Sequence, residues 1–522
     1  MNPKASLKPL KKALYIFRRD LRLEDNSGLN ACLSASNEVI PCFIFDEKQI
    51  VPSKNLYFSH NSVQFMVESL LSLDKNLQSL GSRLFCFNGK YPNIIEEILN
   101  NVNPEALYLN EDYSPYSKER DDLIAQSCKE KGVKFLSYHD ITLLEKDKVF
   151  VASGSFYKKF TPYYRQASKE SIRKPAKLMS YPHFVSKVFT IANEFPQDQI
   201  KEFYIENKSI HVHGGREEAL KHLEKVKTLT NYETTRDFPE LPTTNLSAYT
   251  KFGCISIREF YWSIKDSLGT KKGEPLLRQL YWRDFYSYIL YYYPHVSKGP
   301  MKPSYSAIKW ENNEKFFEAW KEGNTGVPIV DAGMRSMNTT GYMHNRLRMI
   351  CSNFLIKVLL IDWRLGEKYF ASKLVDYDIA QNNGGWQWSS STGTDSQPYF
   401  RIFNPKLQSE KFDKNCKFIL KWVPELKNVL NKSHIHDWEN FADLNKNKMK
   451  IDYPECIASY TKRKEMALEM YKNALGGKAD NEDGEYDNQG GKEAKSKVSK
   501  KKSGGQIVLD NEKNEPSKRV KK

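Results

Sequence analysis

Short apolar runs alternate with longer amphipathic stretches over residues 1–140. The apolar runs are rich in β-branched and aromatic side chains and read ALYIF (13–17), EVIPCFIF (38–45), RLFCF (83–87), ALYL (106–109) and KFLSY (134–138). Residues 62–80 and 91–100 lie between such runs and repeat their apolar positions with the period of an amphipathic helix. This alternation predicts βαβ units, and therefore an N-terminal α/β domain with a Rossmann-like parallel sheet. Neither a GxGxxG motif nor a Walker loop accompanies it.

Residues 206–475 have helical periodicity and no strand pattern of similar strength, which predicts a second, all-α domain. Its amphipathic segments are 214–226, 257–268, 274–293, 315–322, 328–339, 344–362 and 367–374. Between the two domains, residues 141–205 mix Pro, Lys and aromatic residues without a period. We interpret this segment as a connector wrapped over the surface and not as a third core.

The last segment, residues 476–522, has the composition of a disordered tail. Aromatic residues almost vanish, and Gly, Asn, Asp, Glu and Lys dominate. Two Lys-rich clusters read KSKVSKKK (495–502) and KRVKK (518–522). They fit a nuclear localisation signal or a loose DNA tether, and equally a solvated tail that only aids solubility.

The charge and cysteine content restrict the partner and the compartment. The 522-residue chain has a formal net charge of +16; its last 47 residues hold 12 Lys and Arg against 9 Asp and Glu, which leaves +13 on the rest. A basic body favours a polyanion, nucleic acid first, although membrane-surface proteins share this property. No run of about 18 apolar residues exists and the N-terminal apolar run is too short for a signal peptide, so we expect neither a membrane span nor secretion. Eight scattered cysteines fit a reducing compartment, the cytoplasm or the nucleus.

Two stretches of the helical region have side chains unlike those of a core. Residues 382–405, NNGGWQWSSSTGTDSQPYFRIFNP, form a polar, Gly-rich stretch that we interpret as a loop built for a site. One helix face presents an amide, an indole, a guanidinium and a phenol at i, i+3, i+4 and i+7, from Gln279, Trp282, Arg283 and Tyr286. The HxH pairs at 211/213 and 434/436 lack a supporting Cys or carboxylate, so we expect surface histidines and no metal site.

These stretches are similar, nearly residue for residue, to segments of class I cyclobutane pyrimidine dimer (CPD) DNA photolyases of the photolyase/cryptochrome superfamily. The resemblance extends from about residue 14 to residue 471. Besides 382–405, the matching segments are FRRDLRLEDN (17–26), YETTRDFP (232–239), TTNLSAYTKFGCIS (243–256), YWRDFY (281–286), GYMHNRLRMI (341–350), IDWRLGEKYF (361–370) and EKFD (410–413). It implies a deoxyribodipyrimidine photo-lyase, a light-dependent carbon–carbon lyase in which FADH⁻ passes an electron to a dimer flipped out of DNA.

The resemblance also implies a bent FAD in the helical domain. Asn382 would face flavin N5, and Arg348 with Asp376 and Asp378 would lie around the isoalloxazine ring, although alone they would read as an ordinary ion pair. The other residues that the resemblance assigns to FAD are Tyr232, Thr243, Thr244, Asn245, Leu246, Ser247, Gln279 and Tyr377. Taken by itself, the Thr/Ser run would more often be a helix cap.

Electron transfer and DNA binding are assigned by the same resemblance. It implies a tryptophan triad of Trp386, Trp363 and Trp310 that leads to the flavin, whereas we expect Trp262, Trp320, Trp422 and Trp438 in packing or at the surface. Trp282 and Trp388 would sandwich the dimer, which Gln279, Asn345 and Met349 would hold. The residues placed near the DNA strand are Arg236, Arg283, Arg346, Gln408 and Lys411, and for Lys411 a plain solvated charge remains an alternative.

Some positions depart from the CPD pattern. Gln279 stands where CPD enzymes commonly have Glu, and is more like (6-4) photolyases, but Asn345 and Met349 replace the paired histidines of those enzymes. Cyclobutane dimers are therefore favoured. Asn382 favours repair over a cryptochrome-type blue-light receptor, and a light-independent nucleic-acid-binding protein with the same fold is a third interpretation. We expect a monomer.

The residues that would bind an antenna chromophore also depart. Folate-type members of the family have an Asn-Glu pair where this chain has Tyr116 and Ser117. Residues 110–121, with Lys251, look more like those of deazaflavin binders. The resemblance therefore leaves the antenna chromophore open between a deazaflavin and a folate.

Overall fold

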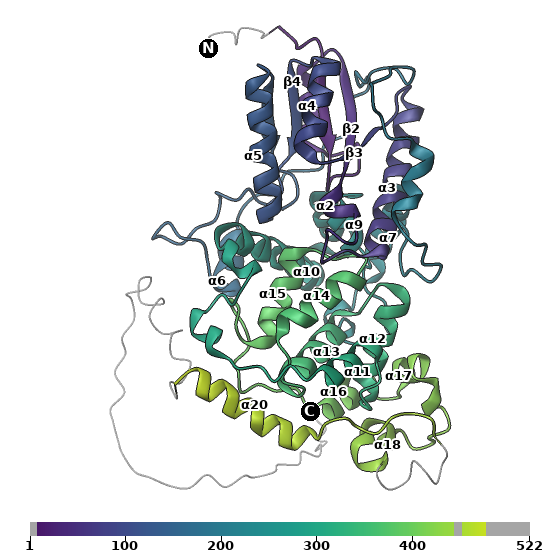
Figure 1. Ribbon diagram of the computed structural model, residues 1–522, viewed down its shortest axis with the longest axis vertical. Coiled ribbons are helices and arrows are strands. Elements are labelled where there is room, and N and C mark those ends of the chain that lie inside the picture. Colours follow the sequence, from purple (N-terminus) through teal and green to yellow (C-terminus); the bar gives the residue numbers. More distant parts are fainter. Residues whose placement is uncertain (1–7, 443–450, 477–522) are drawn as a thin grey trace, which may run out of the picture. The chain divides into compact units, whose positions relative to one another are not determined.

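The computed structural model describes residues 8–442 and 451–476 (Figure 1). Both Lys-rich clusters of the expected tail, and all of 476–522 except its first residue, lie outside these ranges. Among the helices within them, none combines the length and the apolar character needed to cross a membrane.

A five-stranded parallel sheet forms the N-terminal region, with the strand order β3-β2-β1-β4-β5. Its strands are β1 (Ala13–Phe17), β2 (Val39–Asp46), β3 (Phe85–Gly89), β4 (Ala106–Asn110) and β5 (Lys134–Tyr138). Each strand begins within two residues of its predicted apolar run. The predicted parallel sheet is therefore confirmed.

Helices cover both faces of this sheet. They are α1 (Ser27–Ala35), α3 (His60–Ser79), α4 (Tyr91–Val102) and α5 (Pro115–Glu130), and α2 (Glu47–Ile50) follows β2. Leu14 and Ile16 of β1 share a core cluster with α4 and α5, which lie beside the sheet in Figure 1, whereas Tyr15 and Phe17 share one with α1 and α3. Burial on both faces explains why the strands read as almost continuous apolar runs.

The rest of the described chain is helical. Its α-helices are α6 (Phe160–Ala167), α7 (Arg216–Glu224), α8 (Tyr232–Thr235), α9 (Ser247–Phe252), α10 (Ile257–Tyr292), α11 (Glu314–Glu322), α12 (Pro328–Thr340), α13 (Asn345–Lys357), α14 (Trp363–Lys373), α15 (Ile379–Ser390), α16 (Pro405–Phe412), α17 (Lys417–Trp422), α18 (Lys432–His436) and α20 (Tyr460–Ala474). No strand occurs in residues 206–442 or 451–476. The predicted all-α region is confirmed over these residues.

Helix α10 carries many of the residues that matter below. The two helices predicted at 257–268 and 274–293 are joined in α10 across a kink at Gly269, whose φ of 69° and ψ of −178° are not helical. Ser256 and Glu259 form a capping box that begins the helix. Before the kink, Arg258 contacts the sheet region, and after it the backbone oxygen of Arg283 accepts from Gln381 of α15 at 2.9 Å.

The loop expected at 382–405 is wrong for its first nine residues, because α15 extends to Ser390. The side chain of Asp378 caps the helix by accepting from the backbone N–H groups of Ala380 and Gln381, and Ser391 ends it in the left-handed region at φ 66°. Trp386 packs so closely on α14 that a Cβ at Gly366 would lie 2.2 Å from its ring. Tertiary packing therefore imposes a helix on a sequence of low helical propensity.

The connector is also more buried than we expected. It contains α6, and its residues Leu143, Phe156, Phe160 and Tyr163 belong to the core cluster that joins the sheet region to α10. Buried ion pairs cross the same boundary, since Arg258 of α10 contacts Asp25 at 2.8 Å and Asp140 at 2.6 Å. Residues 141–205 thus contribute to one continuous core.

Candidate functional site

A buried amide–carboxyl pair links α14 and α15. Asn382 Nδ2 donates to Glu367 Oε1 at 2.8 Å and to the backbone oxygen of Glu367 at 3.0 Å. Burial raises the pKa of Glu367 to about 7, and the hydrogen bond from Asn382 opposes this only in part. Because the amide nitrogen is used on Glu367, the amide oxygen of Asn382 is left as an acceptor.

Next to Asn382, helix α15 presents open space. Gly385 follows Asn382 by three residues, so both lie on one side of the helix. Gly385 is exposed although Asn382 and Trp386 are buried, and a Cβ built on it would meet no atom within 4 Å. This part of α15 is therefore open, with the buried Asn382 amide one turn away.

An arginine and a carboxylate from neighbouring elements face each other nearby. Arg348 of α13 donates to Asp376 Oδ1 and Oδ2 at 3.0 and 2.9 Å, and its Nε donates to the backbone oxygen of Met343 at 2.8 Å. Asp376 is buried and Arg348 is half-buried. The pair therefore places a compensated positive charge at a partly open position.

Asp378 belongs to a separate ion cluster that reaches the sheet region. One of its oxygens caps α15 and the other pairs with Arg19, which also contacts Asp112 at 2.9 Å. Burial alone would raise the pKa of Asp378, but the cations Arg19 and Lys251 hold it at about 2. Burial, and then Arg19, lower the pKa of Lys251 to about 8. Asp378 thus joins the two regions of the chain, and both of its oxygens have protein partners.

The run 243–247 lies at the beginning of α9. Thr243 and Thr244 are half-buried, Ser247 is exposed, and Leu246 points into the core. Asn245, at φ 52°, accepts from His211 Nε2 at 3.2 Å. The first backbone N–H groups of α9 have no partners within the helix, so the segment offers amides and hydroxyls to an anion.

His211 and Tyr342 connect this run with the Arg348–Asp376 pair. Their rings stack with centroids 4.1 Å apart and planes 7° apart. Burial raises the pKa of Tyr342, which a hydrogen bond from Thr243 and the charge of Arg348 oppose. Tyr232 is half-buried, and burial raises its pKa to about 12. The structure thus brings the residues predicted at the phosphates close to those predicted at the ring.

The donor set fits FAD. The open face at Gly385 suits a planar ring system, the Asn382 oxygen suits an N–H at its edge, and Arg348 suits a negative charge on the ring. The hydroxyls and free amides of 243–247 suit a pyrophosphate. For Tyr377 the structure gives a different setting, since its half-buried ring stacks with Tyr57 of the sheet region, with ring centroids 5.9 Å apart.

The second half of α10 presents the predicted polar face. Gln279, Trp282, Arg283 and Tyr286 are all half-buried, while the residues between them are buried. Trp282 stacks on Phe160 of α6, with ring centroids 3.7 Å apart and planes 8° apart. One face of the indole is thereby covered.

Arg283 and Gln279 of this face also bond to the backbone. Arg283 donates to the backbone oxygens of Ile141 and Thr250, and burial lowers its pKa. Gln279 donates to the backbone oxygen of Pro275 at 3.1 Å. Arg283 therefore joins α9 to the segment that follows β5, whereas the side-chain oxygen of Gln279 accepts no hydrogen bond from residues 8–442 or 451–476.

The other residues predicted at DNA surround the N-terminus of α13 and helix α16. Asn345 is exposed and donates to Met349 Sδ at 3.7 Å. Arg346 pairs with Asp237 at 2.9 Å and lies over the ring of Phe412 at 4.2 Å. The remaining members differ in exposure, with Lys411 exposed and Arg236, Trp388 and Gln408 half-buried. The buried Oε1 of Gln408 has no partner among the described residues.

The three predicted electron-transfer tryptophans lie in or against one core cluster. Trp386 and Trp363 are 2% and 3% exposed, whereas Trp310 is half-buried at the edge of the cluster. Trp320 and Trp438 are fully buried, as expected for packing, and the Trp320 ring meets Trp386 edge-on at 6.1 Å. Burial therefore decreases from Trp386 and Trp363 in the interior to Trp310 near the surface.

Sequence reasoning missed three neighbours of the site. Glu367 lies inside a quoted segment, IDWRLGEKYF, but a lone Glu on an amphipathic helix reads as solvated. Phe160, which backs Trp282, lies in the presumed surface connector, and His211 was assigned to the surface only. Among residues 8–442 and 451–476, no group of three or more His, Cys, Asp or Glu side chains could hold a metal ion.

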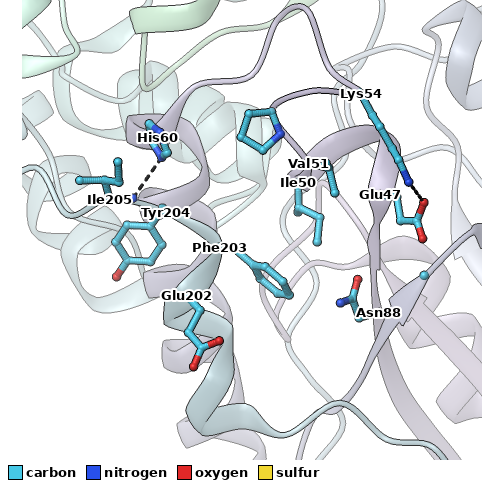
Figure 2. A pocket seen from close by; sticks show the side chains of 12 residues that line it. Glu47, Ile50, Val51, Lys54, His60, Asn88, Glu202, Phe203, Tyr204 and Ile205 are labelled. Carbon is cyan, nitrogen blue, oxygen red and sulfur yellow. Dashed lines mark hydrogen bonds and ion pairs between the residues drawn. The ribbon is translucent and has the colours of Figure 1, made fainter.

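Two of the residues expected at an antenna chromophore form hydrogen bonds with other side chains of the protein. Asn110 is buried in a network with Tyr15, Asp20 and Asn26, and Tyr116 donates to Asp46. A cavity of about 420 Å³ lies close by, beyond the ends of β2 and β3. In Figure 2, Ile50 and Phe203 line this cavity between the Glu47–Lys54 pair and His60, which accepts from the backbone N–H of Ile205.

Comparisons with known proteins agree on one family. Residues 13–180 match the family described as DNA photolyase, and residues 276–473 match the family described as FAD binding domain of DNA photolyase. A deoxyribodipyrimidine photo-lyase of Alkalihalophilus pseudofirmus is 36% identical over 482 residues, 88% of this chain and 98% of that protein. One from Escherichia coli is 33% identical, over 89% of this chain and 99% of that protein.

Solved structures give the same result. An archaeal photolyase from Sulfolobus tokodaii, described as having two FAD molecules, has 43% identity and a TM-score of 0.78 over 88% of this chain and all of its own. A class III photolyase from Agrobacterium tumefaciens has 31% identity and a TM-score of 0.82 over 90% of this chain and 99% of its own. A Synechocystis cryptochrome, at 24% identity, shares the fold with a TM-score of 0.80.

Proposed function

This chain belongs to the DNA photolyase family, and from that premise we propose that it is a deoxyribodipyrimidine photo-lyase that uses light and FAD to repair cyclobutane pyrimidine dimers in UV-damaged DNA. The observation that carries the proposal is the Asn382–Glu367 pair beside the open face at Gly385, on the helix that also contacts the aromatic face of α10. The test is the removal of dimers from a UV-treated oligonucleotide by the purified protein. Removal under blue light and none in the dark supports the proposal, and no removal under either condition contradicts it.

When bound in its reduced form, FAD would supply the light-excited electron that splits the dimer and would take it back afterwards. The protein would bind the cofactor and the lesion and position them relative to each other. Glu367 holds the Asn382 amide, whose oxygen would accept from an N–H of the ring, and Arg348 would balance negative charge on the ring. Trp282 and Trp388 provide flat apolar surfaces for bases that have left the helical stack. Trp310, Trp363 and Trp386 form the route by which an electron reaches an oxidised flavin.

Cyclobutane dimers are the favoured lesion because the two side chains that stand in place of the paired histidines of (6-4) photolyases are not acids. Asn345 and Met349 lie one turn apart and in contact, and neither can donate a proton as a protonated histidine does. Gln279 can donate to a carbonyl and accept from an imide N–H of the paired bases. Oligonucleotides that carry one CPD or one (6-4) product distinguish the two lesions, and repair of the (6-4) product alone would contradict this assignment.

We propose that the cavity of about 420 Å³ binds a second chromophore, a deazaflavin or another flavin in preference to a folate. Ligands of parallel α/β sheets bind beyond the carboxyl ends of the strands, where this cavity lies. The similar Sulfolobus tokodaii photolyase contains a second FAD. The absorption spectrum of the native protein tests this, since a second pigment adds to the flavin bands. Phe203→Arg should remove the added bands and leave those of FAD.

We also propose that the protein is a monomer and that it acts in the cytoplasm or the nucleus. Light scattering during size-exclusion chromatography measures the mass in solution. Whether residues 495–502 and 518–522 direct nuclear import is tested with a fluorescent fusion, with and without residues 477–522. If deletion of residues 477–522 leaves the distribution of the fusion between nucleus and cytoplasm unchanged, the Lys clusters serve solubility and not nuclear import.

A further inference from the structure

The two tryptophans that we propose on either side of the dimer come from different helices. Trp282 lies in α10, and Trp388 lies near the end of α15. The two helices touch at Tyr286 and Gly384, where a Cβ built on the glycine would lie 2.3 Å from the tyrosine ring. Each tryptophan is one turn away from that contact along its own helix. The separation of the two indoles therefore also depends on what supports each of them from behind.

Trp388 is supported by the segment that follows α15. Residues 391–397, called here the return segment, fold back on the turn that carries Trp388. The backbone oxygen of the residue before Trp388 accepts from the N–H of Gly393 at 3.1 Å, and that of the residue after it accepts from Gln397 Nε2 at 3.1 Å. A Cβ built on Gly393 would lie 2.7 Å from the side chain of Gln387. The return segment and the backbone of Trp388 thus form one unit.

Trp282 is supported by Phe160 at the beginning of α6, the helix that lies against α10 in Figure 1. The two rings stack with centroids 3.7 Å apart and planes 8° apart, and Phe160 is buried. The first N–H groups of a helix have no partner within it, and α6 has no side-chain cap from its own N-cap residue. The position of Phe160, and with it that of the indole, therefore depends on how the beginning of α6 is held.

Two hydrogen bonds join the return segment to the beginning of α6. The Asp395 carboxylate accepts from the backbone N–H of Phe160 at 3.2 Å, and the buried hydroxyl of Thr394 donates to the backbone oxygen of Lys158. Asp395 thereby supplies from a distant part of the chain the cap that α6 lacks, and it places a negative charge at the positive end of the helix. The supports of the two tryptophans are therefore bonded to each other.

Asp395 adopts a backbone conformation that few residue types share. Its φ of 45° lies in the left-handed region, which only Gly, Asn and Asp adopt readily. Burial, and then the nearby charge of Asp395, raise the pKa of the Tyr286 phenol, so the carboxylate also lies close to the contact between α10 and α15. Asn and Gly both fit this backbone, but only Asn keeps an oxygen for the Phe160 amide. The contact can therefore be removed without a change of backbone.

We propose that Thr394 and Asp395 are positioning residues that set the width of the lesion pocket between Trp282 and Trp388. This inference rests on the proposed repair function, which places the dimer between the two indoles. Neither positioning residue has to touch the dimer. Dispersion contacts weaken steeply when a gap opens between two surfaces, so a change in the separation of the indoles alters the affinity for the dimer. It leaves the contacts with the phosphates unchanged.

Four variants separate the two contacts from the backbone that carries them. Thr394→Val removes the hydroxyl and keeps the shape of the side chain, whereas Thr394→Ser keeps the hydroxyl. Asp395→Gly removes the carboxylate from a backbone position that glycine adopts freely, whereas Asp395→Asn keeps an acceptor oxygen. The matched control is Asn313→Ala, which removes the side-chain cap of α11, a nine-residue helix that does not belong to the pocket.

Dissociation constants are measured in the dark for duplexes that contain one thymine dimer, one uracil dimer or no lesion. A uracil dimer has the same rings as a thymine dimer but lacks its two methyl groups. The ratio of the two dimer constants therefore reports the fit of the pocket, and a general loss of protein stability does not change this ratio. Flavin absorption shows that each variant has folded.

Thr394→Val and Asp395→Gly should each raise the dissociation constant for the thymine dimer about fivefold to tenfold, equivalent to part of one base-stacking contact, and should change the ratio about threefold. Their affinity for undamaged duplex should equal that of the parent protein. Thr394→Ser, Asp395→Asn and Asn313→Ala should keep the parent's ratio.

A ratio equal to the parent's in Thr394→Val and Asp395→Gly, or the same change of ratio in Asn313→Ala, would overturn the proposal. If the parent repairs dimers under light and the first two variants keep its ratio, only the positioning role fails. If the parent neither prefers damaged to undamaged duplex nor repairs dimers, the repair function fails and the positioning role fails with it.

Discussion

Asn382 donates two hydrogen bonds to Glu367, one to the carboxyl and one to the backbone oxygen of the same residue, at 2.8 and 3.0 Å. Both residues are buried, and the two bonds leave the amide only one orientation. The acceptor of Asn382 therefore has a fixed direction before any flavin binds. An amide held in this way is preorganised for the flavin N–H that we propose it meets.

Glu367 should give stability a measurable dependence on pH. Its pKa is about 4.5 in the unfolded chain and about 7 in the folded chain, because burial disfavours the carboxylate. Burial of the carboxylate therefore lowers the free energy of unfolding by about 3 kcal/mol above pH 7, and this destabilisation disappears as the pH falls toward 4.5. Glu367→Gln should be the more stable protein at pH 8 and should lose this advantage near pH 5. Urea unfolding at pH 5 and pH 8 measures the free energy of unfolding of the variant and the parent. An equal difference between the two proteins at both pH values would contradict the raised pKa of Glu367.

The three tryptophans proposed for electron transfer should separate photoreduction from repair. Trp386→Phe, Trp363→Phe or Trp310→Phe should stop the light-driven reduction of oxidised flavin, because Phe is much harder to oxidise than Trp. Repair should persist when the flavin is reduced chemically beforehand. The matched control is Trp320→Phe, since Trp320 is equally buried and meets Trp386 edge-on at 6.1 Å. Flavin absorption during illumination is the readout, and an equal defect in the control would assign the effect to packing.

Removal of the Trp282 ring should weaken lesion binding. Stacking of a base on an aromatic side chain contributes about 1–3 kcal/mol, so Trp282→Ala should raise the dissociation constant for a dimer-containing duplex about tenfold to a hundredfold. Binding to undamaged duplex should change little, because that binding depends on phosphates. Phe160→Leu keeps an apolar side chain behind the indole but removes the stacked ring, and a smaller loss is expected. The two duplexes are compared by fluorescence anisotropy in the dark.

Lys357 should hold the segment that follows α15. It is fully buried, and its Nζ donates to Ser391 Oγ at 2.9 Å and to the backbone oxygens of Tyr399 and Arg401 at 3.2 and 3.0 Å. Lys357→Met would leave these acceptors unpaired, at about 1–3 kcal/mol each. Amide hydrogen exchange in residues 391–401 should accelerate, and damaged-DNA affinity should fall because this segment directly follows the end of α15, which carries Trp388 of the proposed lesion pocket. Lys368→Met, an exposed lysine of α14, is the control and should change neither.

Helix α15 shows where sequence-based prediction of secondary structure failed. Its composition of Asn, Gly, Ser and two tryptophans is typical of a loop, and local propensity argues against a helix. The Asp378 cap and the contact of Trp386 with Gly366 stabilise it from outside the segment. The connector gave a related error, since only the tertiary structure shows that Phe160 backs Trp282.

The sequence by itself determined the five strands and the helical second region, and its resemblance to photolyases supplied the residues that we propose at flavin and DNA. It could do so because alternation and helical periodicity are local, and because the motifs keep their order along the chain. Only the tertiary structure decided which of those residues meet. Asn382 and Glu367 are 15 residues apart, Arg19 and Asp378 are 359 apart, and Phe160 stacks on a ring from another element. Such contacts depend on how helices pack, and the free energy of packing belongs to the whole core and to no single segment.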